Sequence, residues 1–135
     1  GAKEKETCSL EGRRVLLAED NLINMEIATE ILTMHGVEVI PAEDGEKAVE
    51  AFRESAPFSI DAILMDMQMP NVNGCQAARA IRALDRPDAA TIPIIAVTAN
   101  AFPEDIAETQ AAGMNAHIVK PIDFNVLCKL LQELT

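Results

Sequence analysis

Five short apolar runs, separated by stretches with helical spacing, are the feature that most constrains the fold of this chain. The runs lie at residues 13–18, 37–41, 60–65, 92–98 and 116–119. Several are nearly continuous rather than alternating, as in strands that are covered on both faces. Between the runs, apolar residues recur every three or four positions, which predicts helices. Strand and helix therefore alternate five times, and this order predicts a parallel sheet with helices on both faces.

Residues that start and stop helices support this division. The first helix is predicted to end at Gly36, because glycine readily adopts the left-handed conformation found after helices. Asp44 is a suitable N-cap for the second helix. The fourth is predicted to open at Pro103 and to end at Gly113, and the fifth to begin near Asp123. With right-handed crossovers, the natural α/β fold is a flavodoxin-like, doubly wound (βα)5 sheet of order 2-1-3-4-5.

The length of 135 residues fits one domain. Residues 1–12 are polar and without periodicity, and we interpret them as a linker or a cloning remnant that precedes a domain at residues 13–135. No repeat indicates a second domain. No apolar run approaches the ~18 residues that a membrane span needs, and no signal peptide is visible.

The formal net charge of −11 argues against direct binding to nucleic acid or to an anionic membrane, and it favours cations and basic partners. Three arginines at positions 79, 82 and 86 are predicted to form a solvated basic stripe on the third helix. The cysteine count of three is odd and the cysteines are far apart, so we expect reduced thiols, neither a disulfide framework nor a zinc site, and a cytoplasmic protein.

Polar residues that carry chemistry follow four of the five predicted strands. Glu19 and Asp20 follow the first strand, Asp66 the third, Thr98 ends the fourth and Lys120 follows the fifth. Ligands of open α/β sheets bind beyond the carboxyl ends of the strands, where the winding reverses. Each residue alone is more often structural than functional, but all of them are expected to meet at that one edge.

This set has a specific chemistry. Neighbouring carboxylates repel one another unless a cation compensates them, and an all-oxygen ligand set favours Mg²⁺ over zinc. Lys120 adds a point charge suited to phosphate, and Thr98 can donate a hydrogen bond to a phosphoryl group. A carboxylate in this setting can act as a nucleophile towards phosphorus. Catalysis would then consist of positioning and charge neutralisation, as is usual for phosphoryl transfer.

Four segments resemble the receiver domains of response regulators and hybrid sensor histidine kinases: VLLAEDN (15–21), ILMDMQMP (63–70), AVTANA (96–101) and HIVKPI (117–122). The resemblance covers nearly the whole domain. It implies a role in two-component phosphorelay signalling, with a histidine kinase or a histidine phosphotransfer domain as partner. It also implies that the domain promotes its own phosphorylation and dephosphorylation, and that a parent chain could itself be a membrane-anchored histidine kinase.

The resemblance further implies roles for the matching positions. Asp66 would be the phosphoacceptor. Asp20 and Asp66 would bind Mg²⁺ directly, Gln68 would contribute its backbone carbonyl, and Glu19 would act through water. Mn²⁺ is expected to substitute for Mg²⁺. Lys120 would contact the phosphoryl group together with Asp66.

Two further pairs of positions would control the signal. Thr98 and His117 would form the switch, although the family often has Tyr or Phe where this chain has His117. A plain strand histidine packed at the sheet edge therefore stays an alternative for His117. Gln68 and Asn100 would tune the lifetime of the phosphate.

Other functions of such a fold need residues that this chain lacks, or stay open as alternatives. A nucleotide- or flavin-binding module needs a glycine-rich loop after the first strand, where this chain has Glu19, Asp20 and Asn21. An acyl-phosphate hydrolase usually has a second acid where this chain has Gln68. A free-standing single-domain regulator, and less so a phosphate-independent interaction module, stay open beside the receiver module of a hybrid kinase. We expect a monomer or a weak dimer.

Overall fold

The computed structural model describes residues 10–67, 69, 72–99, 102–120 and 122–135. Within these residues the chain forms a five-stranded, all-parallel sheet of order β2-β1-β3-β4-β5. The predicted order is confirmed. The strands are β1 (Arg14–Ala18), β2 (Glu38–Ala42), β3 (Ala62–Asp66), β4 (Ile94–Thr98) and β5 (Ala116–Val119).

A helix follows each strand, and local capping explains where most of the helices begin. Asp44 accepts a hydrogen bond from the backbone N–H of Lys47 at 2.8 Å, and Pro103 occupies the first turn of its helix, so both predicted starts are confirmed. Asn73 and Gln76 form a capping box. The helices are α2 (Leu22–Met34), α3 (Gly45–Glu54), α4 (Gly74–Arg82), α5 (Pro103–Ala111) and α6 (Phe124–Leu134).

The ends of α2 and α5 confirm the predicted glycine stops. Gly36 and Gly113 have φ values of 83° and 93°, which side chains disfavour. After α2, the N–H of Val37 donates to the carbonyl oxygen of Leu32 at 3.1 Å, as in a Schellman motif. The glycine therefore turns the chain directly from the end of α2 into β2.

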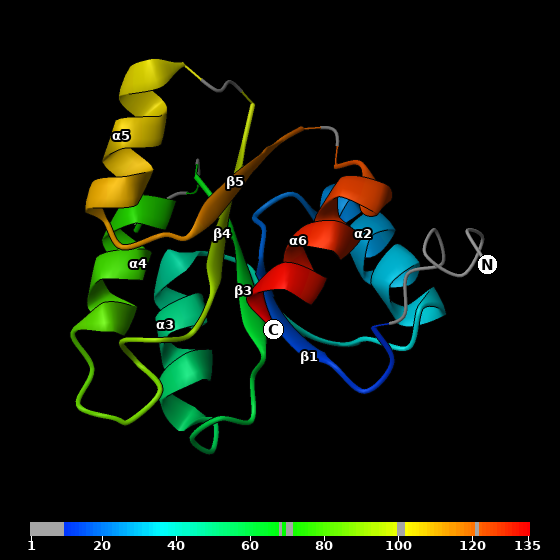
Figure 1. The fold of residues 1–135 in the computed structure, drawn as a ribbon, viewed down its shortest axis with the longest axis horizontal. Coiled ribbons are helices and arrows are strands. Elements are labelled where there is room, and N and C mark those ends of the chain that lie inside the picture. The colour runs from blue at the N-terminus through cyan, green and yellow to red at the C-terminus, as the bar shows by residue number, and fades with distance from the viewer. Residues whose placement is uncertain (1–9, 68, 70–71, 100–101, 121) are drawn as a thin grey trace.

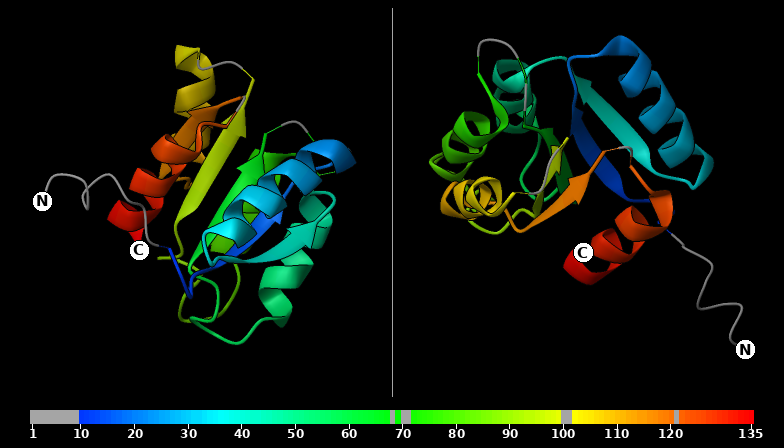
Figure 2. Two further views of the ribbon diagram at one scale, coloured as in Figure 1. Left: turned by 90° about the vertical axis from the view of Figure 1, so that its right-hand side faces the viewer. Right: turned by 90° about the horizontal axis from the view of Figure 1, so that it is seen from above.

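Alternate residues of each strand face opposite layers of helices. Val15 and Leu17 belong to the core under α2 and α6, whereas Leu16 and Ala18 belong to the core under α3, α4 and α5. Figures 1 and 2 show the two helical layers on either side of the sheet. Burial on both faces explains why the strands are apolar almost throughout. Among the described helices, none has the length and apolarity to span a bilayer.

Two features near the termini differ from expectation. Leu10 is fully buried in the core under α2 and α6, and the N–H of Gly12 donates to the carbonyl oxygen of Gly36 at 3.0 Å, so the packed chain extends at least to Leu10. Cys128 is disulfide-bonded, whereas Cys75 is free and buried, so the prediction of three reduced thiols is wrong. Spacing along the sequence did not reveal which sulfur atoms folding brings together.

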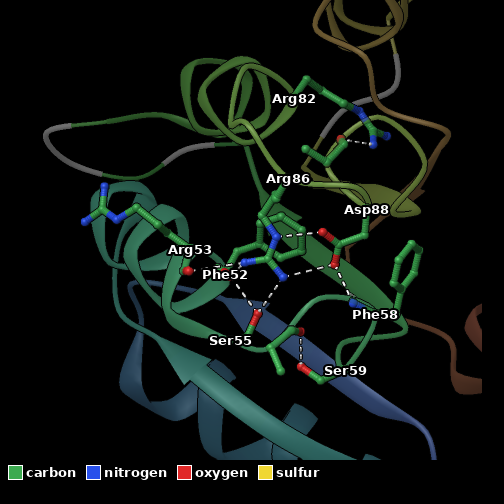
Figure 3. A network of polar contacts seen from close by, with 10 residues as sticks. Phe52, Arg53, Ser55, Phe58, Ser59, Arg82, Arg86 and Asp88 are labelled. Atoms are coloured by element: carbon green, nitrogen blue, oxygen red, sulfur yellow. Dashed lines mark hydrogen bonds and ion pairs between the residues drawn. The ribbon is translucent and has the colours of Figure 1, made fainter.

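A buried ion pair fastens the end of the sheet opposite the carboxyl ends of the strands. Arg86 Nε lies 2.6 Å from Asp88 Oδ1, with exposed side-chain fractions of only 10% and 2%. The guanidinium group also lies over the ring of Phe52, 4.3 Å from its centroid. Asp88 accepts a further hydrogen bond from the N–H of Phe58 at 2.8 Å (Figure 3). The pair thus joins α3, the loop before β3 and the loop before β4.

The expected basic stripe is therefore only partly correct. Arg82 Nε and Nη2 donate to the carbonyl oxygen of Gly113 at 3.0 and 2.8 Å, so this arginine ties α4 to the end of α5. Arg86 belongs to the buried network, and of the three arginines only Arg79 is fully exposed. Guanidinium groups have five donors, and here they satisfy backbone carbonyls that helices leave unpaired.

We predict that Asp88→Asn lowers the free energy of unfolding by about 3 kcal/mol at pH 7, because Arg86 would lose its buried partner. The hydrogen bond from Arg86 lowers the pKa of Asp88 although burial opposes the shift. A lowered carboxyl pKa stabilises the fold above the unfolded-state value of about 3.9, and the benefit is lost as pH falls through the folded-state value.

Urea unfolding of Asp88→Asn, wild type and Asp85→Asn at several pH values checks this prediction. Asp85 is an exposed acid of the same loop and serves as the control. The difference between Asp88→Asn and wild type should shrink towards pH 3. If Asp88→Asn and the control Asp85→Asn had the same urea midpoint at pH 7, the structural role of the pair of Arg86 and Asp88 would be contradicted.

Candidate functional site

Three acids gather at the carboxyl ends of β1 and β3. Ala18 pairs with Met65 in the sheet register, so Glu19 and Asp66, the residues that follow, emerge side by side. Carboxylate oxygens of Glu19, Asp20 and Asp66 all lie within 4.8 Å of one another. The chain runs in opposite directions across the sheet from β1, to β2 on one side and to β3 on the other. The acids thus lie at the predicted point of reversal.

The burial of these acids makes their charge costly. Glu19 and Asp66 are only 6% and 2% exposed, whereas Asp20 is exposed. Burial, followed by the hydrogen bond and negative charge of Asp66, raises the pKa of Glu19 to about 7. The N–H of Asn21 donates to Glu19 Oε2 at 3.2 Å, and the side chain of Asn21 also caps α2. The start of α2 therefore fixes the position of the Glu19 carboxylate.

Lys120 supplies the positive charge nearest to these acids. Its Nζ atom lies 3.0 Å from Asp66 Oδ2 and 3.7 Å from Glu19 Oε1. Its backbone N–H donates to the carbonyl oxygen of Thr98 at 2.7 Å, which fixes the lysine at the end of β5. Burial opposes the charge of Lys120, but the hydrogen bond and the charge of Asp66 prevail and raise its pKa. One ammonium group thus faces three carboxylates.

Thr98 and His117 line one small cavity of about 150 Å³ behind Asp66. Met67, the residue after Asp66, forms part of its wall, and Asp105 and Thr109 of α5 close it on another side. The structure therefore brings the two proposed switch residues to a common space between β4, β5 and α5. Their roles stay predictions. Gln68 and Asn100, for which metal binding and control of the phosphate lifetime were predicted, lie outside the described residues.

Gly74 is a residue of this site that the sequence reading missed. A Cβ atom built on Gly74 would lie 2.5 Å from the backbone oxygen of Asp66, so any side chain would push α4 away from the end of β3. The N–H of Gly74 also donates to the carbonyl oxygen of Met67 at 3.3 Å. The pattern of Asn73 followed by Gly74 signals a helix start, but it does not reveal this close approach.

The donor set fits a hard divalent cation. Three carboxylates within reach of one point offer only oxygen, which suits Mg²⁺ and disfavours zinc. The pKa of Glu19 is raised chiefly by burial and then by its hydrogen bond with Asp66, and the charge of Lys120 does not reverse the shift. Of the two buried acids, Asp66 makes the shorter contact with Lys120, at 3.0 Å, and it is the last residue of β3. Its role as the phosphoacceptor stays a prediction.

Sequence comparison finds relatives among histidine kinases. Hybrid signal transduction histidine kinase I of Dictyostelium discoideum is 37% identical over 131 residues, which are 90% of this chain and 8% of that protein. The CAI-1 autoinducer sensor kinase/phosphatase CqsS of Vibrio cholerae is 39% identical over 85% of this chain and 16% of that protein. The chain therefore matches only a small part of these curated relatives.

Solved structures agree in fold. The receiver domain of sensor histidine kinase PA1611 from Pseudomonas aeruginosa, with a magnesium ion in its active site cleft, has a TM-score of 0.81 and 36% identity, covering 91% of this chain and 97% of that one. A co-crystal structure of the Saccharomyces cerevisiae histidine phosphotransfer signaling protein Ypd1 with the receiver domain of Ssk1 matches with a TM-score of 0.79 and 28% identity, over 90% and 88% of the two chains.

The model of one family covers nearly all of the described fold. The match spans residues 15–132, from the first residues of β1 into the last turn of α6, and it includes all four residues whose side chains meet at the sheet edge. The chain belongs to the response regulator receiver domain family.

Proposed function

We propose that this domain takes a phosphoryl group from a phosphohistidine onto Asp66, in the presence of Mg²⁺, and thereby switches a partner-binding face in phosphorelay signalling. The observation that carries the proposal is the contact of the buried Glu19 and Asp66 with the half-buried Lys120, with the exposed Asp20 at their edge. Bringing these four charged side chains together requires removing water from them, which costs free energy, and they add nothing to the apolar core. This cost supports a chemical role.

In the proposed reaction an Asp66 carboxylate oxygen forms a bond to phosphorus while the bond between phosphorus and the histidine nitrogen breaks. The imidazole leaves with the bonding electrons, and Asp66 becomes an acyl phosphate. Lys120, 3.0 Å from Asp66, is placed to stabilise the negative phosphoryl oxygens. Mg²⁺ held by Asp20 and Asp66, with Glu19 acting through water, would neutralise further negative charge.

We further propose that the new phosphoryl group attracts the Thr98 hydroxyl and that His117 moves with it. Both side chains line the cavity behind Asp66, and this space offers room for such a rearrangement. α5 and β5 also bound the cavity, so their outer surface would change with phosphorylation. That surface is the proposed output face.

The phosphodonor is proposed to be a histidine kinase or a histidine phosphotransfer domain that docks on the first turns of α2. Leu22, Ile23 and Ile27 are 71%, 69% and 54% exposed, which is unusual for large apolar side chains at the start of a helix. This patch begins two residues after Asp20, so a donor that covers it would hold its histidine near Asp66. In a hybrid kinase, or as a free-standing regulator, the domain would work in the cytoplasm.

Three predictions test the proposed function, and the first of these concerns the phosphorylated residue. Incubation with Mg²⁺ and a phosphohistidine donor should label the domain with one base-labile phosphate, and Asp66→Asn should abolish the label because an amide is not a nucleophile here. Asp44→Asn is the matched control, since asparagine caps α3 as well as aspartate does. Mass spectrometry after labelling reads out the site, and a label that survives Asp66→Asn would contradict the assignment.

The second prediction separates the roles of lysine and metal. Lys120→Ala should slow phosphoryl transfer at least about tenfold, whereas the affinity for Mg²⁺ should stay equal or increase, because a positive charge next to the carboxylates is removed. Calorimetry with Mg²⁺ and a phosphotransfer time course measure the two effects. The exposed Lys129→Ala is the control. Transfer at the wild-type rate would remove the role proposed for Lys120.

The third prediction concerns donor docking. Ile23→Lys should raise KM for a protein phosphodonor but leave labelling by the small donor acetyl phosphate unchanged, since a small donor needs no docking surface. Met34→Lys is the control on the same helix, because Met34 is 74% exposed and lies about 16 Å further along the axis. Equal effects of both variants, or a loss with acetyl phosphate too, would argue against docking at the start of α2.

A further inference from the structure

An apolar cavity of about 410 Å³ lies between α2 and α6, next to the proposed phosphorylation site. Its walls come from Leu17 of β1, from Ala28 and Ile31 of α2, and from Phe124 and Leu127 of α6. The volume falls within the range of pockets that bind small molecules. One end of this space shares Glu19 and Lys120 with the proposed phosphorylation site, and Ile27 of the proposed docking patch also lines it. The proposed switch does not use the cavity, which lies on the other face of the sheet from α5.

The outer wall of the cavity is held in place. The ring of Phe124 stacks on the ring of His35, with centroids 4.0 Å apart and planes inclined by 24°. His35 Nδ1 is hydrogen-bonded to the carbonyl oxygen of Ile31 at 2.9 Å. This aromatic pair links the start of α6 to the end of α2. At least at Phe124, the wall of the cavity is therefore held by an existing contact.

One end of the cavity is polar and carries excess negative charge. Glu19 and Lys120 both contribute to its lining. The lysine is already engaged by Asp66 at 3.0 Å and by Glu19 at 3.7 Å, and Asp20 lies within 4.8 Å of both acids. Asp20 and Asp66 do not line the cavity, but with Glu19 they outnumber the one ammonium group near this end, so a second cation is favoured there and an anion is repelled.

We propose that this cavity binds a small amphipathic cation, with an apolar body between α2 and α6 and an ammonium or guanidinium head paired with Glu19. Apolar contacts would supply most of the affinity, and the Glu19 carboxylate would make binding selective for a positively charged head. If Asp66 accepts phosphate as proposed above, the ligand would also oppose Mg²⁺ binding and phosphoryl transfer, because its head competes for Glu19. By linkage, Mg²⁺ would weaken ligand binding by the same factor.

The test uses three probes with the same eight-carbon chain, below their aggregation concentrations and without Mg²⁺ or phosphodonor. Octylammonium should bind one-to-one by calorimetry and more tightly than 1-octanol, with octanoate weakest. Glu19→Gln should reduce the preference for octylammonium over 1-octanol. Octanoate binding as tightly as octylammonium, or an unchanged preference in Glu19→Gln, would overturn the proposed charge selection.

Ala28→Phe should fill the cavity and raise the Kd for octylammonium about tenfold. Ala107→Phe is the matched control, because Ala107 is exposed on α5 at the other face of the sheet. Methyl resonances of Ile31 and Leu127 in the wild-type protein give a second readout that needs no variant, and they should shift on titration. Shifts confined to exposed Ile23 and Met34, or equal Kd values for the two variants, would show surface adsorption and overturn the site.

These outcomes are independent of the phosphorylation chemistry. Binding is measured on the unphosphorylated protein, so a failure of Asp66 labelling would leave the cavity result intact. Conversely, an absence of octylammonium binding would leave the phosphoacceptor role of Asp66 untouched. Only the expected competition with Mg²⁺ depends on both proposals.

Discussion

The contact between Lys120 and Asp66 is the interaction on which the rest of the site depends. It joins the end of β5 to the end of β3 across the intervening β4, and it places a cation within 4 Å of two buried carboxylates. Without this charge, Glu19 and Asp66 would repel each other in a poorly solvated place. With it, the site is compensated only in part, which leaves an electrostatic reason to take up a metal ion.

The two ends of the sheet treat buried acids differently. Asp88 is matched by Arg86 through two nitrogen–oxygen contacts and by the N–H of Phe58, and its pKa is lowered. Glu19 accepts one hydrogen bond from a backbone N–H and lies 3.7 Å from the ammonium group of Lys120, and its pKa is raised to about 7. A fully satisfied acid stabilises the fold. An incompletely satisfied one marks the end at which further positive charge would bind.

Much of this could be predicted from the sequence, because the deciding signals are local. Glycines at Gly36 and Gly113 end helices through their own backbone preference, and near-continuous apolar runs indicate strands buried on both faces. The acids after β1 and β3 were expected to meet because parallel strands end at a common edge. Here the geometry of the sheet converts positions far apart in sequence into neighbours.

What the sequence did not reveal depends on contacts between segments. Arg86 looked like a solvated arginine, yet its partners come from α3 and from its own loop. The sequence around Gly74 indicates no more than a helix start, and only the distance to the Asp66 backbone shows why a side chain is excluded there. The cavity between α2 and α6 is a gap between two helices that contact the same sheet, and no residue type in a sequence indicates such a gap.

α2 connects the features that the sequence predicted with those that it did not. Its first residues follow Asp20 directly, its N-cap Asn21 bonds Glu19, and its inner face lines the cavity. A small rotation of this helix would therefore change the exposed docking patch, the position of the Glu19 carboxylate and the width of the cavity together. Because packed helices move as units rather than residue by residue, we expect binding at any one of these three places to change the structure at the other two.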